Sequence, residues 1–310
     1  MEPVYLRAYQ TTMLQERIEQ ALAILGCCTL CPRECRVNRL ADERGFCQTG
    51  RCALISSYAP HFGEEDPLVG SGGSGTIFFT YCSLGCVFCQ NYDISHRGAG
   101  AEVGASGLAA IMIRLQEQGV HNINLVTPSH VVAQILEALP LAIEAGLHLP
   151  LVYNSSGYET VETLALLDGI IDIYMPDLKF AESDSARRYC NAPDYPERAR
   201  AAITEMHRQV GALVINEQGI AERGVLVRHL VMPEGIAGTY ELMKFLAENV
   251  SPDTYVNIMN QYRPCGDAEK FPEICRAVTA AEYQQALDAA HRAGIRRLDR
   301  RLPRFLLSRH

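Results

Sequence analysis

Long apolar runs, an excess of basic residues and an export signal are all missing from this sequence. No apolar stretch reaches the roughly 18 residues that a membrane-spanning helix needs, so we expect no membrane segment. The N-terminus lacks a basic start followed by an unbroken apolar core, which argues against a secretory signal. The formal net charge of −8 argues against general affinity for nucleic acid. We therefore expect a soluble, cytoplasmic protein with neither membrane nor nucleic acid as a partner.

Cysteine, by contrast, is abundant. Twelve cysteines in a chain without an export signal indicate a reducing compartment, where thiols bind metals or do chemistry instead of forming disulfides. Six of them lie between residues 27 and 52, three lie between residues 82 and 89, and three are scattered. The two dense groups are the candidate functional sites.

Most of the chain alternates between predicted strands and predicted helices. Six short runs rich in Val, Ile, Tyr and Phe are typical of buried strands, at residues 76–81, 121–127, 149–155, 169–179, 224–232 and 254–260. Segments with apolar residues three and four apart separate them, at 105–119, 129–146, 159–169, 196–211 and 238–249. This alternation predicts an α/β fold with a parallel sheet over residues 71–310. Residues 1–70 differ, with a helix near 10–25 and then a small cysteine-rich extension.

A dinucleotide-binding glycine motif is also missing. No G-x-G-x-x-G follows the first predicted strand, which disfavours a doubly wound dinucleotide-binding domain. Polar residues cluster instead where successive predicted strands end, as active-site groups do at one rim of a barrel. Six units are too few for a closed eightfold barrel. We therefore expect an open, partial (β/α)6 barrel.

Three of the cysteines form the stretch C-x3-C-x2-C, at Cys82, Cys86 and Cys89. Thiolates select zinc, copper(I) or iron–sulfur clusters, and structural zinc almost always takes four protein ligands. No fourth Cys or His follows at the customary spacing. A 4Fe–4S cubane on three cysteines keeps one iron open for a substrate or cofactor. A zinc knuckle or a set of buried core cysteines is the alternative.

This spacing, with Phe88 directly before Cys89, resembles the radical S-adenosylmethionine superfamily. The run GSGTIFFTYCSLGCVFCQN resembles the activating enzymes of pyruvate formate-lyase, and the earlier CTLCPRECRVNR followed by GFC resembles an uncharacterised branch of their relatives. The resemblance implies a partial barrel with a 4Fe–4S cluster on the three cysteines and S-adenosylmethionine on the fourth iron. It further implies reductive cleavage to a 5′-deoxyadenosyl radical, with reduced flavodoxin or ferredoxin as the electron donor.

The resemblance also implies where S-adenosylmethionine is held. Thr127 and Ser129 stand where relatives carry Gly-Gly-Glu for the methionyl amine, and Asn154 and Ser156 fall in the stretch matching Asp-Thr-Asn-Gly. Asp177 and Lys179 match the family's Asp-x-Lys, and Lys179 is a positive partner for the carboxylate of S-adenosylmethionine. Arg228 is a second partner for the same carboxylate. No further catalytic residue is predicted.

The N-terminal cysteines supply a second set of four thiols, Cys28, Cys31, Cys35 and Cys47. Four ligands suit a closed structural site, so we expect zinc or a second iron–sulfur cluster there. The alternative is a reduced loop without metal, whose Arg33, Arg36 and Arg39 face solvent.

The favoured function is thus a radical S-adenosylmethionine oxidoreductase that abstracts hydrogen from an unknown substrate. The nearest named relatives act on a glycyl-radical enzyme, and a peptide or small molecule is a competing substrate. The alternative from another class is a non-catalytic scaffold or electron carrier that binds zinc or an iron–sulfur cluster.

Overall fold

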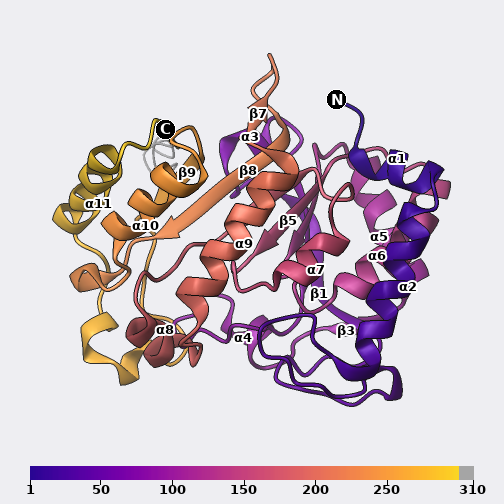
Figure 1. Ribbon diagram of the computed structural model, residues 1–310, viewed down its shortest axis with the longest axis horizontal. Helices are drawn as coiled ribbons and strands as arrows, with labels where there is room; N and C mark the ends of the chain where they lie inside the picture. The colour runs from indigo at the N-terminus through magenta and orange to yellow at the C-terminus, as the bar shows by residue number, and fades with distance from the viewer. Residues whose placement is uncertain (300–310) are drawn as a thin grey trace, which may run out of the picture.

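The computed structural model describes residues 1–299, and a mixed, mostly parallel β-sheet lies at its centre (Figure 1). Within these residues the strand order is β10-β9-β8-β6-β5-β4-β2-β1-β3, and β7 pairs with β8 off this path. The strands are β1 (Ala53–His61), β2 (Ser74–Phe79), β3 (Ala101–Val103), β4 (Ile123–Val126), β5 (Leu151–Ser155), β6 (Ile173–Pro176), β7 (Val214–Ile215), β8 (Ala221–Leu230), β9 (Tyr255–Met259) and β10 (Arg297–Leu298).

The six predicted strands are confirmed as β2, β4, β5, β6, β8 and β9, which are neighbours in this order and parallel throughout. The sheet is wider than predicted, because β1 and β3 add an antiparallel edge next to β2. Strand β1 lies inside residues 1–70, so the N-terminal region contributes to the sheet. Its sequence contains Pro60, which removes a backbone donor and weakens the strand pattern.

Helices cover the sheet, and all the predicted ones are present. The α-helices are α1 (Val4–Gln10), α2 (Met13–Ile24), α3 (Asp66–Val69), α4 (Tyr92–Ser95), α5 (Ala105–Glu117), α6 (Val132–Glu144), α7 (Val161–Leu166), α8 (Ser183–Cys190), α9 (Tyr195–Val210), α10 (Thr239–Phe245) and α11 (Ala280–Ala293). Helices α1, α3, α4, α8 and α11 were not predicted. In Figure 1, α1 and α2 lie beside α5 and α6 at one end of the molecule, while α10 and α11 lie at the other. No helix within residues 1–299 is long and apolar enough to cross a membrane.

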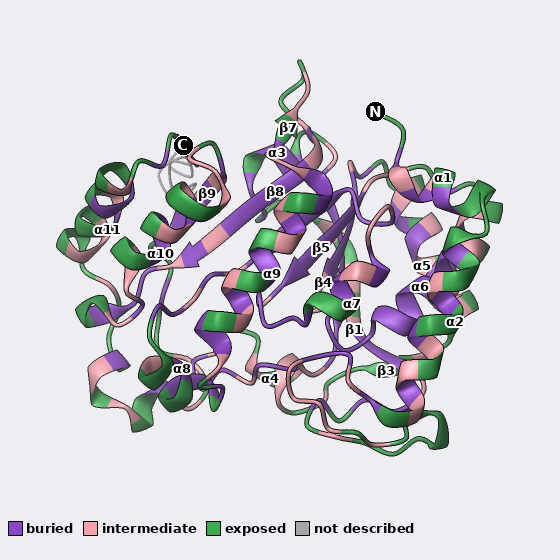
Figure 2. Cartoon of the chain, viewed as in Figure 1, coloured by how far each residue is buried: buried purple, intermediate pink, exposed green. Residues whose placement is uncertain are grey.

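The two faces of the sheet carry different side chains, because successive residues of a strand point to opposite sides. One face is apolar and packs on the helices, and Figure 2 shows the strands buried along most of their length. The other face carries Val152 and Leu226 in a small apolar cluster with Leu68 of α3. Two residues further along the same strands, this face carries Asn154 and Arg228. This face, called the inner face below, is therefore polar near the carboxyl ends of β5 and β8.

Asp172, just before β6, links the start of helix α1 to the start of β5. Its carboxylate oxygens accept hydrogen bonds from the backbone N–H groups of Val4 and Leu151, both at 2.9 Å. Burial raises the pKa of Asp172 to about 6, from an ordinary value of 3.8. The native state therefore binds this proton more tightly than the unfolded chain does, and the contribution of Asp172 to stability falls as pH rises between these two values.

This linkage predicts the behaviour of Asp172→Asn. As pH rises from about 4 to about 7, the free energy of unfolding of the wild type should fall relative to that of the variant by up to about 3 kcal/mol. The reason is that Asp172 loses a proton over this range, whereas the amide has none to lose. Urea unfolding at fixed pH values measures this difference. Asp168→Asn, at a more exposed carboxylate, should show no such trend, and a flat difference for Asp172→Asn would contradict the prediction.

Candidate functional site

A cavity of about 220 Å³ lies at the carboxyl ends of the parallel strands, on the inner face of the sheet. All three cysteines of the C-x3-C-x2-C stretch line it: Cys82, Cys86 and Cys89. Six of the seven side chains that were predicted to hold S-adenosylmethionine line the same cavity: Thr127, Asn154, Ser156, Asp177, Lys179 and Arg228. These residues come from five different strand ends, and the fold brings them together.

Each of the three cysteine sulfurs receives a hydrogen bond within its own loop or from a neighbour. The backbone N–H of Leu84 donates to Cys82 Sγ at 3.3 Å, and the Ser95 hydroxyl donates to Cys89 Sγ at 3.1 Å. Burial raises the pKa of Cys82 to about 12, and burial also raises that of Cys89. In the absence of metal these thiols are therefore protonated at neutral pH, and a soft metal centre is the partner that would hold them as thiolates.

The donor set suits a 4Fe–4S cluster with one open iron better than a structural zinc ion, which almost always takes four protein ligands. Within residues 1–299, no group of three or more Cys, His, Asp and Glu side chains converges on one point, either here or at the N-terminal cysteines. Three thiols on one loop beside an open cavity fit such a cluster in number and in chemistry.

A charged network forms the wall of the cavity beyond the thiols. Lys179 Nζ lies 2.6 Å from Asp177 Oδ2, and Arg228 Nε donates to Asp177 Oδ1 at 2.9 Å. Arg228 Nη2 also donates to Asn154 Oδ1 at 2.6 Å. Burial works to raise the pKa of Asp177, but Arg228 and Lys179 outweigh it, so that this pKa lies below its usual value. One carboxylate thus stands between two cations, and the wall carries a net positive charge.

Backbone strain is concentrated at the same rim. Tyr81 and Thr127 follow β2 and β4 and have φ values of 67° and 62°, in the left-handed region that non-glycine residues rarely adopt. At Gly157, after β5, an added Cβ would approach the Asp177 carbonyl oxygen to 2.3 Å. Such outliers persist where the surrounding structure fixes them, and they cluster at binding sites.

Ser129 is the one predicted cofactor residue that does not line the cavity. It is buried, and its hydroxyl donates to Glu159, a buried carboxylate that also accepts from the Tyr153 hydroxyl at 3.1 Å. Burial raises the pKa of Glu159 to about 7. Of the two residues predicted to hold the methionyl amine, only Thr127 therefore lines the cavity.

Sequence reasoning missed two side chains next to the site. Cys190, at the end of α8, is buried, and its Sγ lies 3.4 Å from Cys86 Sγ. The Tyr195 hydroxyl of α9 contacts the carbonyl oxygens of Ser156 and Asp177, at 2.9 and 3.0 Å, and ties the ends of β5 and β6 together. Neither residue belongs to a motif, so no signal in the sequence could have identified them.

A second cavity, of about 500 Å³, adjoins the first and shares Asn154 and Arg228 with it. Two buried acids line it, Glu64 and Glu65. Arg228 Nη1 lies 3.6 Å from Glu64 Oε2, and Asn257 Nδ2 donates to Glu65 Oε1 at 2.8 Å. Burial raises the pKa of Glu65. Arg228 therefore lines both cavities: the first, where cations outnumber the single carboxylate of Asp177, and the second, which carries two buried acids.

The four N-terminal cysteines lie apart from this cavity. Cys28, Cys31, Cys35 and Cys47 line a much smaller one, of about 10 Å³, together with Arg39 and His130. Arg39 is buried, whereas Arg36 is exposed, so the three arginines do not share a solvent-facing side.

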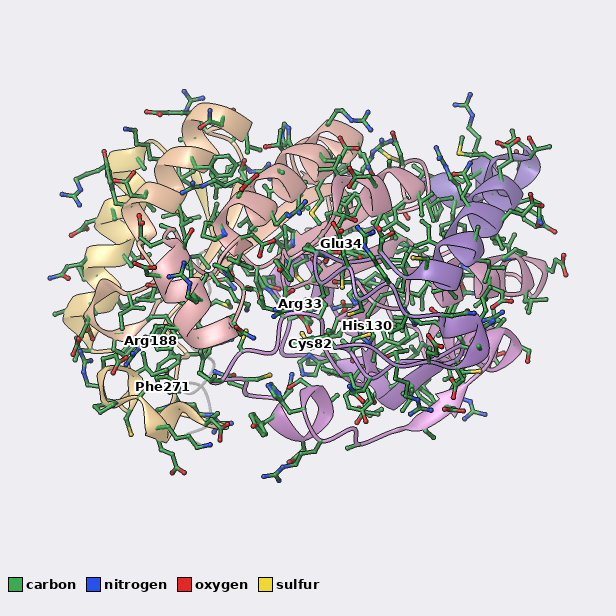
Figure 3. The ribbon with its side chains drawn as sticks, turned by 60° about the horizontal axis from the view of Figure 1, so that its bottom comes forward. Arg33, Glu34, Cys82, His130, Arg188 and Phe271 are labelled. Carbon is green, nitrogen blue, oxygen red and sulfur yellow. The ribbon has the colours of Figure 1, made fainter. Side chains whose placement is uncertain are left out.

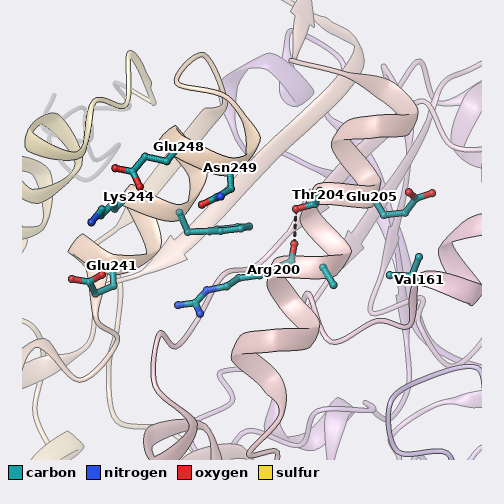
Figure 4. Close-up of a pocket in the computed structure, with 10 residues that line it drawn as sticks. Val161, Arg200, Thr204, Glu205, Glu241, Lys244, Glu248 and Asn249 are labelled. Atoms are coloured by element: carbon teal, nitrogen blue, oxygen red, sulfur yellow. Dashed lines mark hydrogen bonds between the residues drawn. The ribbon is translucent and has the colours of Figure 1, made fainter.

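A broad groove of about 830 Å³ between α9 and α10 is larger than any of these cavities (Figure 4). It is lined by surface charges such as Arg200, Glu241 and Lys244, and the Thr204 hydroxyl is occupied by the Arg200 carbonyl at 2.9 Å. None of its lining residues is a cysteine. The cavity lined by the three thiols is therefore the candidate functional site.

The Asp177 network predicts a large loss of stability for Asp177→Ala. Removing the carboxylate leaves Arg228 and Lys179 buried together without their shared partner, which costs about 3–5 kcal/mol in comparable buried pairs. Asp168→Ala, which breaks the surface pair with Arg208, should cost less than about 1 kcal/mol. Urea unfolding of both variants measures the contrast, and equal losses would show that the network is not stabilising.

Comparison with known proteins places the chain beside one archaeal relative. No family model matches the sequence. The uncharacterized protein MJ0674 of Methanocaldococcus jannaschii is 31% identical over 296 residues, which cover 93% of this chain and 81% of that protein. The match thus covers nearly all of this chain. The chain belongs to the same family as MJ0674.

Proposed function

We propose that the protein is a radical S-adenosylmethionine enzyme. Cys82, Cys86 and Cys89 would hold a 4Fe–4S cluster, and S-adenosylmethionine would take its fourth iron. The observation that carries the proposal is that these thiols and the charged wall of Asp177, Lys179 and Arg228 line one cavity. When bound and reduced, these cofactors supply a 5′-deoxyadenosyl radical that abstracts hydrogen from a substrate.

The six parallel strands fit the partial (β/α)6 barrel of this proposal. Their outer face packs on helices, and their inner face carries an apolar cluster at one end and the thiol-lined cavity at the other. In such barrels the functional groups gather at the carboxyl ends of the strands. The antiparallel strands β1 and β3 extend the sheet past the first of the six.

The chain's own residues have distinct roles in this scheme. Lys179 and Arg228 present positive charge to the cofactor carboxylate, and Asp177 holds both cations in place. Asn154 fixes the far side of the Arg228 guanidinium. Five apolar side chains of the lining would keep water away from a bound cofactor: Phe78, Phe88, Val126, Leu230 and Met259.

The adjoining cavity with Glu64 and Glu65 is the proposed substrate side. Buried acids next to Arg228 suit a substrate with hydrogen-bond donors, such as a peptide backbone. A glycyl-radical enzyme is one partner of this kind, and reduced flavodoxin or ferredoxin is the proposed electron donor.

Anaerobic reconstitution with iron and sulfide tests the function. We expect about four irons per chain from the three-cysteine loop, and conversion of S-adenosylmethionine and dithionite to 5′-deoxyadenosine and methionine. Cys86→Ala should abolish both, whereas Cys275→Ala, at an exposed cysteine outside both groups, should change neither. Wild-type protein that keeps its metal but cleaves no S-adenosylmethionine would instead support the scaffold or electron carrier.

The variant Cys190→Ala tests whether the fourth iron of the cluster has no protein ligand. The Cys190 and Cys86 sulfurs are too close, at 3.4 Å, to bind two different irons of one cubane, whose ligands point outward from separate corners. We therefore expect Cys190→Ala to retain the iron and the cleavage of S-adenosylmethionine. Loss of one iron site in Mössbauer spectra of this variant would mean that a protein thiol fills the corner.

A further inference from the structure

We propose that Cys28, Cys31, Cys35 and Cys47 bind one structural zinc ion, and that this centre positions Arg33 as a brace on the loop of Cys82, Cys86 and Cys89. The zinc assignment stands on the N-terminal segment alone. The effect of the brace on a cluster rests on the proposed function.

The size of the N-terminal cavity favours a single ion. Its volume of about 10 Å³ is close to that of one water-sized sphere, and a cubane does not fit such a space. Cys28, Cys31 and Cys47 are each only 7% exposed, so the thiols are shielded from solvent. The sulfurs surround the cavity without converging on one point in residues 1–299, and metal binding would draw them inward.

Each of the four sulfurs faces an N–H donor. The backbone N–H of Phe46 donates to Cys35 Sγ at 3.2 Å, and Arg39 Nη1 lies 3.8 Å from Cys28 Sγ. The sulfur of Cys31 accepts a hydrogen bond from the backbone N–H of Arg33, and that of Cys47 accepts one from the backbone N–H of Thr49. Donors aimed at sulfur stabilise the thiolate, which is the form that binds metal.

Tight turns make these contacts possible. Glu34, Arg36 and Gln48 have φ values of 40°, 58° and 50°, so the backbone adopts left-handed conformations on both sides of Cys35 and directly after Cys47. Such strain in non-glycine residues persists where it serves a binding geometry. At Gly45 an added Cβ would lie 2.7 Å from Cys35 Sγ, so the chain passes directly over that sulfur.

Two buried polar atoms at the cavity have no partner among the described residues. Arg39 and His130 are each 1% exposed, and Arg39 Nη2 and His130 Nδ1 accept or donate no hydrogen bond. A buried, incompletely paired guanidinium calls for an anion. Zinc with four thiolates carries a net charge of −2, which Arg39 would partly offset. His130 Nε2 lies 2.9 Å from the Thr80 carbonyl oxygen and donates to it, so Nδ1 of this neutral ring carries an unpaired lone pair.

Arg33 connects this centre to the other cysteine loop (Figure 3). It lies between Cys31 and Cys35 in the chain, and its guanidinium donates to carbonyl oxygens of Ser83 and Leu84, both at 2.9 Å. It also donates to carbonyl oxygens at the end of α8, those of Cys190 at 2.9 Å and Asn191 at 2.6 Å. A zinc ion that fixes the cysteines on both sides of Arg33 therefore fixes the loop of Cys82 as well.

Metal analysis of anaerobically purified full-length variants tests the zinc site. The triple variant Cys82→Ala, Cys86→Ala, Cys89→Ala should retain about one zinc per chain and no iron, because four thiols make a closed zinc site. In that background, Cys31→Ser should lose the zinc, whereas Cys52→Ser should keep it. A triple variant without zinc, or one that holds about four irons, would overturn the assignment whatever the wild type does with S-adenosylmethionine.

A measurement on the folded triple variant avoids any failure of Cys31→Ser to fold. Titration with an organic mercurial that caps thiols, followed by a chromogenic zinc chelator, should release one zinc. Release should be complete in the triple variant and absent from a sample already stripped of zinc. Thiol capping with no release of zinc would contradict the proposal.

The brace is tested with Arg33→Ala in the otherwise native chain. It should keep its zinc but lose iron from the reconstituted loop to a chelator faster, on the order of tenfold, since four hydrogen bonds to the loop and α8 are lost. Arg36→Ala, at an exposed arginine in the same segment, is the matched control. Equal rates in the two variants would overturn the brace, and failure of wild-type protein to take up iron would count against the proposed function instead.

Discussion

The carboxylate of Asp177 is the group on which the candidate site depends. It lies directly after β6, and its two oxygens accept hydrogen bonds from the cations of Lys179 and Arg228. It offsets the cost of burying both cations at the carboxyl ends of the strands, because isolated charges are costly to remove from water. Glu64, whose Oε2 lies 3.6 Å from Arg228 Nη1, adds a second counter-charge for Arg228 alone. With it in place, the cavity has a positively charged wall opposite three thiols. The strand order sets this arrangement, since β6 and β8 are neighbours although α8, α9 and β7 separate them in the chain.

The sequence predicts the six parallel strands because their apolar runs are short, dense and bounded by turn residues. It also predicts that Asp177, Lys179 and Arg228 lie at one rim of the sheet, since they stand where successive predicted strands end. It does not predict β1 or β3, whose pairing depends on an antiparallel edge that no local pattern marks. Ser129 shows the limit of positional matching, because one buried carboxylate, Glu159, turns its side chain away from the cavity.

Contacts between distant segments are the part that the sequence cannot supply. Cys190 is a lone cysteine in a helix with two adjacent arginines, and only the folding of α8 against the loop brings it to Cys86. Arg33 similarly reads as one of three evenly spaced arginines. In the structure it stacks on Phe46, 3.9 Å from the ring centroid, and donates to two other segments, while Arg39 is buried and Arg36 is exposed. Equal spacing in the chain thus hides three different environments.

The closeness of Cys86 and Cys190 also affects how the protein tolerates oxygen. Their sulfurs lie 3.4 Å apart, and a disulfide needs only about 2.05 Å, so a small rotation would join them once an oxidant removes two electrons and two protons. The crosslink would tie the middle cysteine of the loop to α8 and prevent it from binding metal. If protein without its metal were exposed to air, a thiol reductant would then break this disulfide and restore metal binding. It would not restore sulfurs that had been oxidised further, to sulfinic or sulfonic acid.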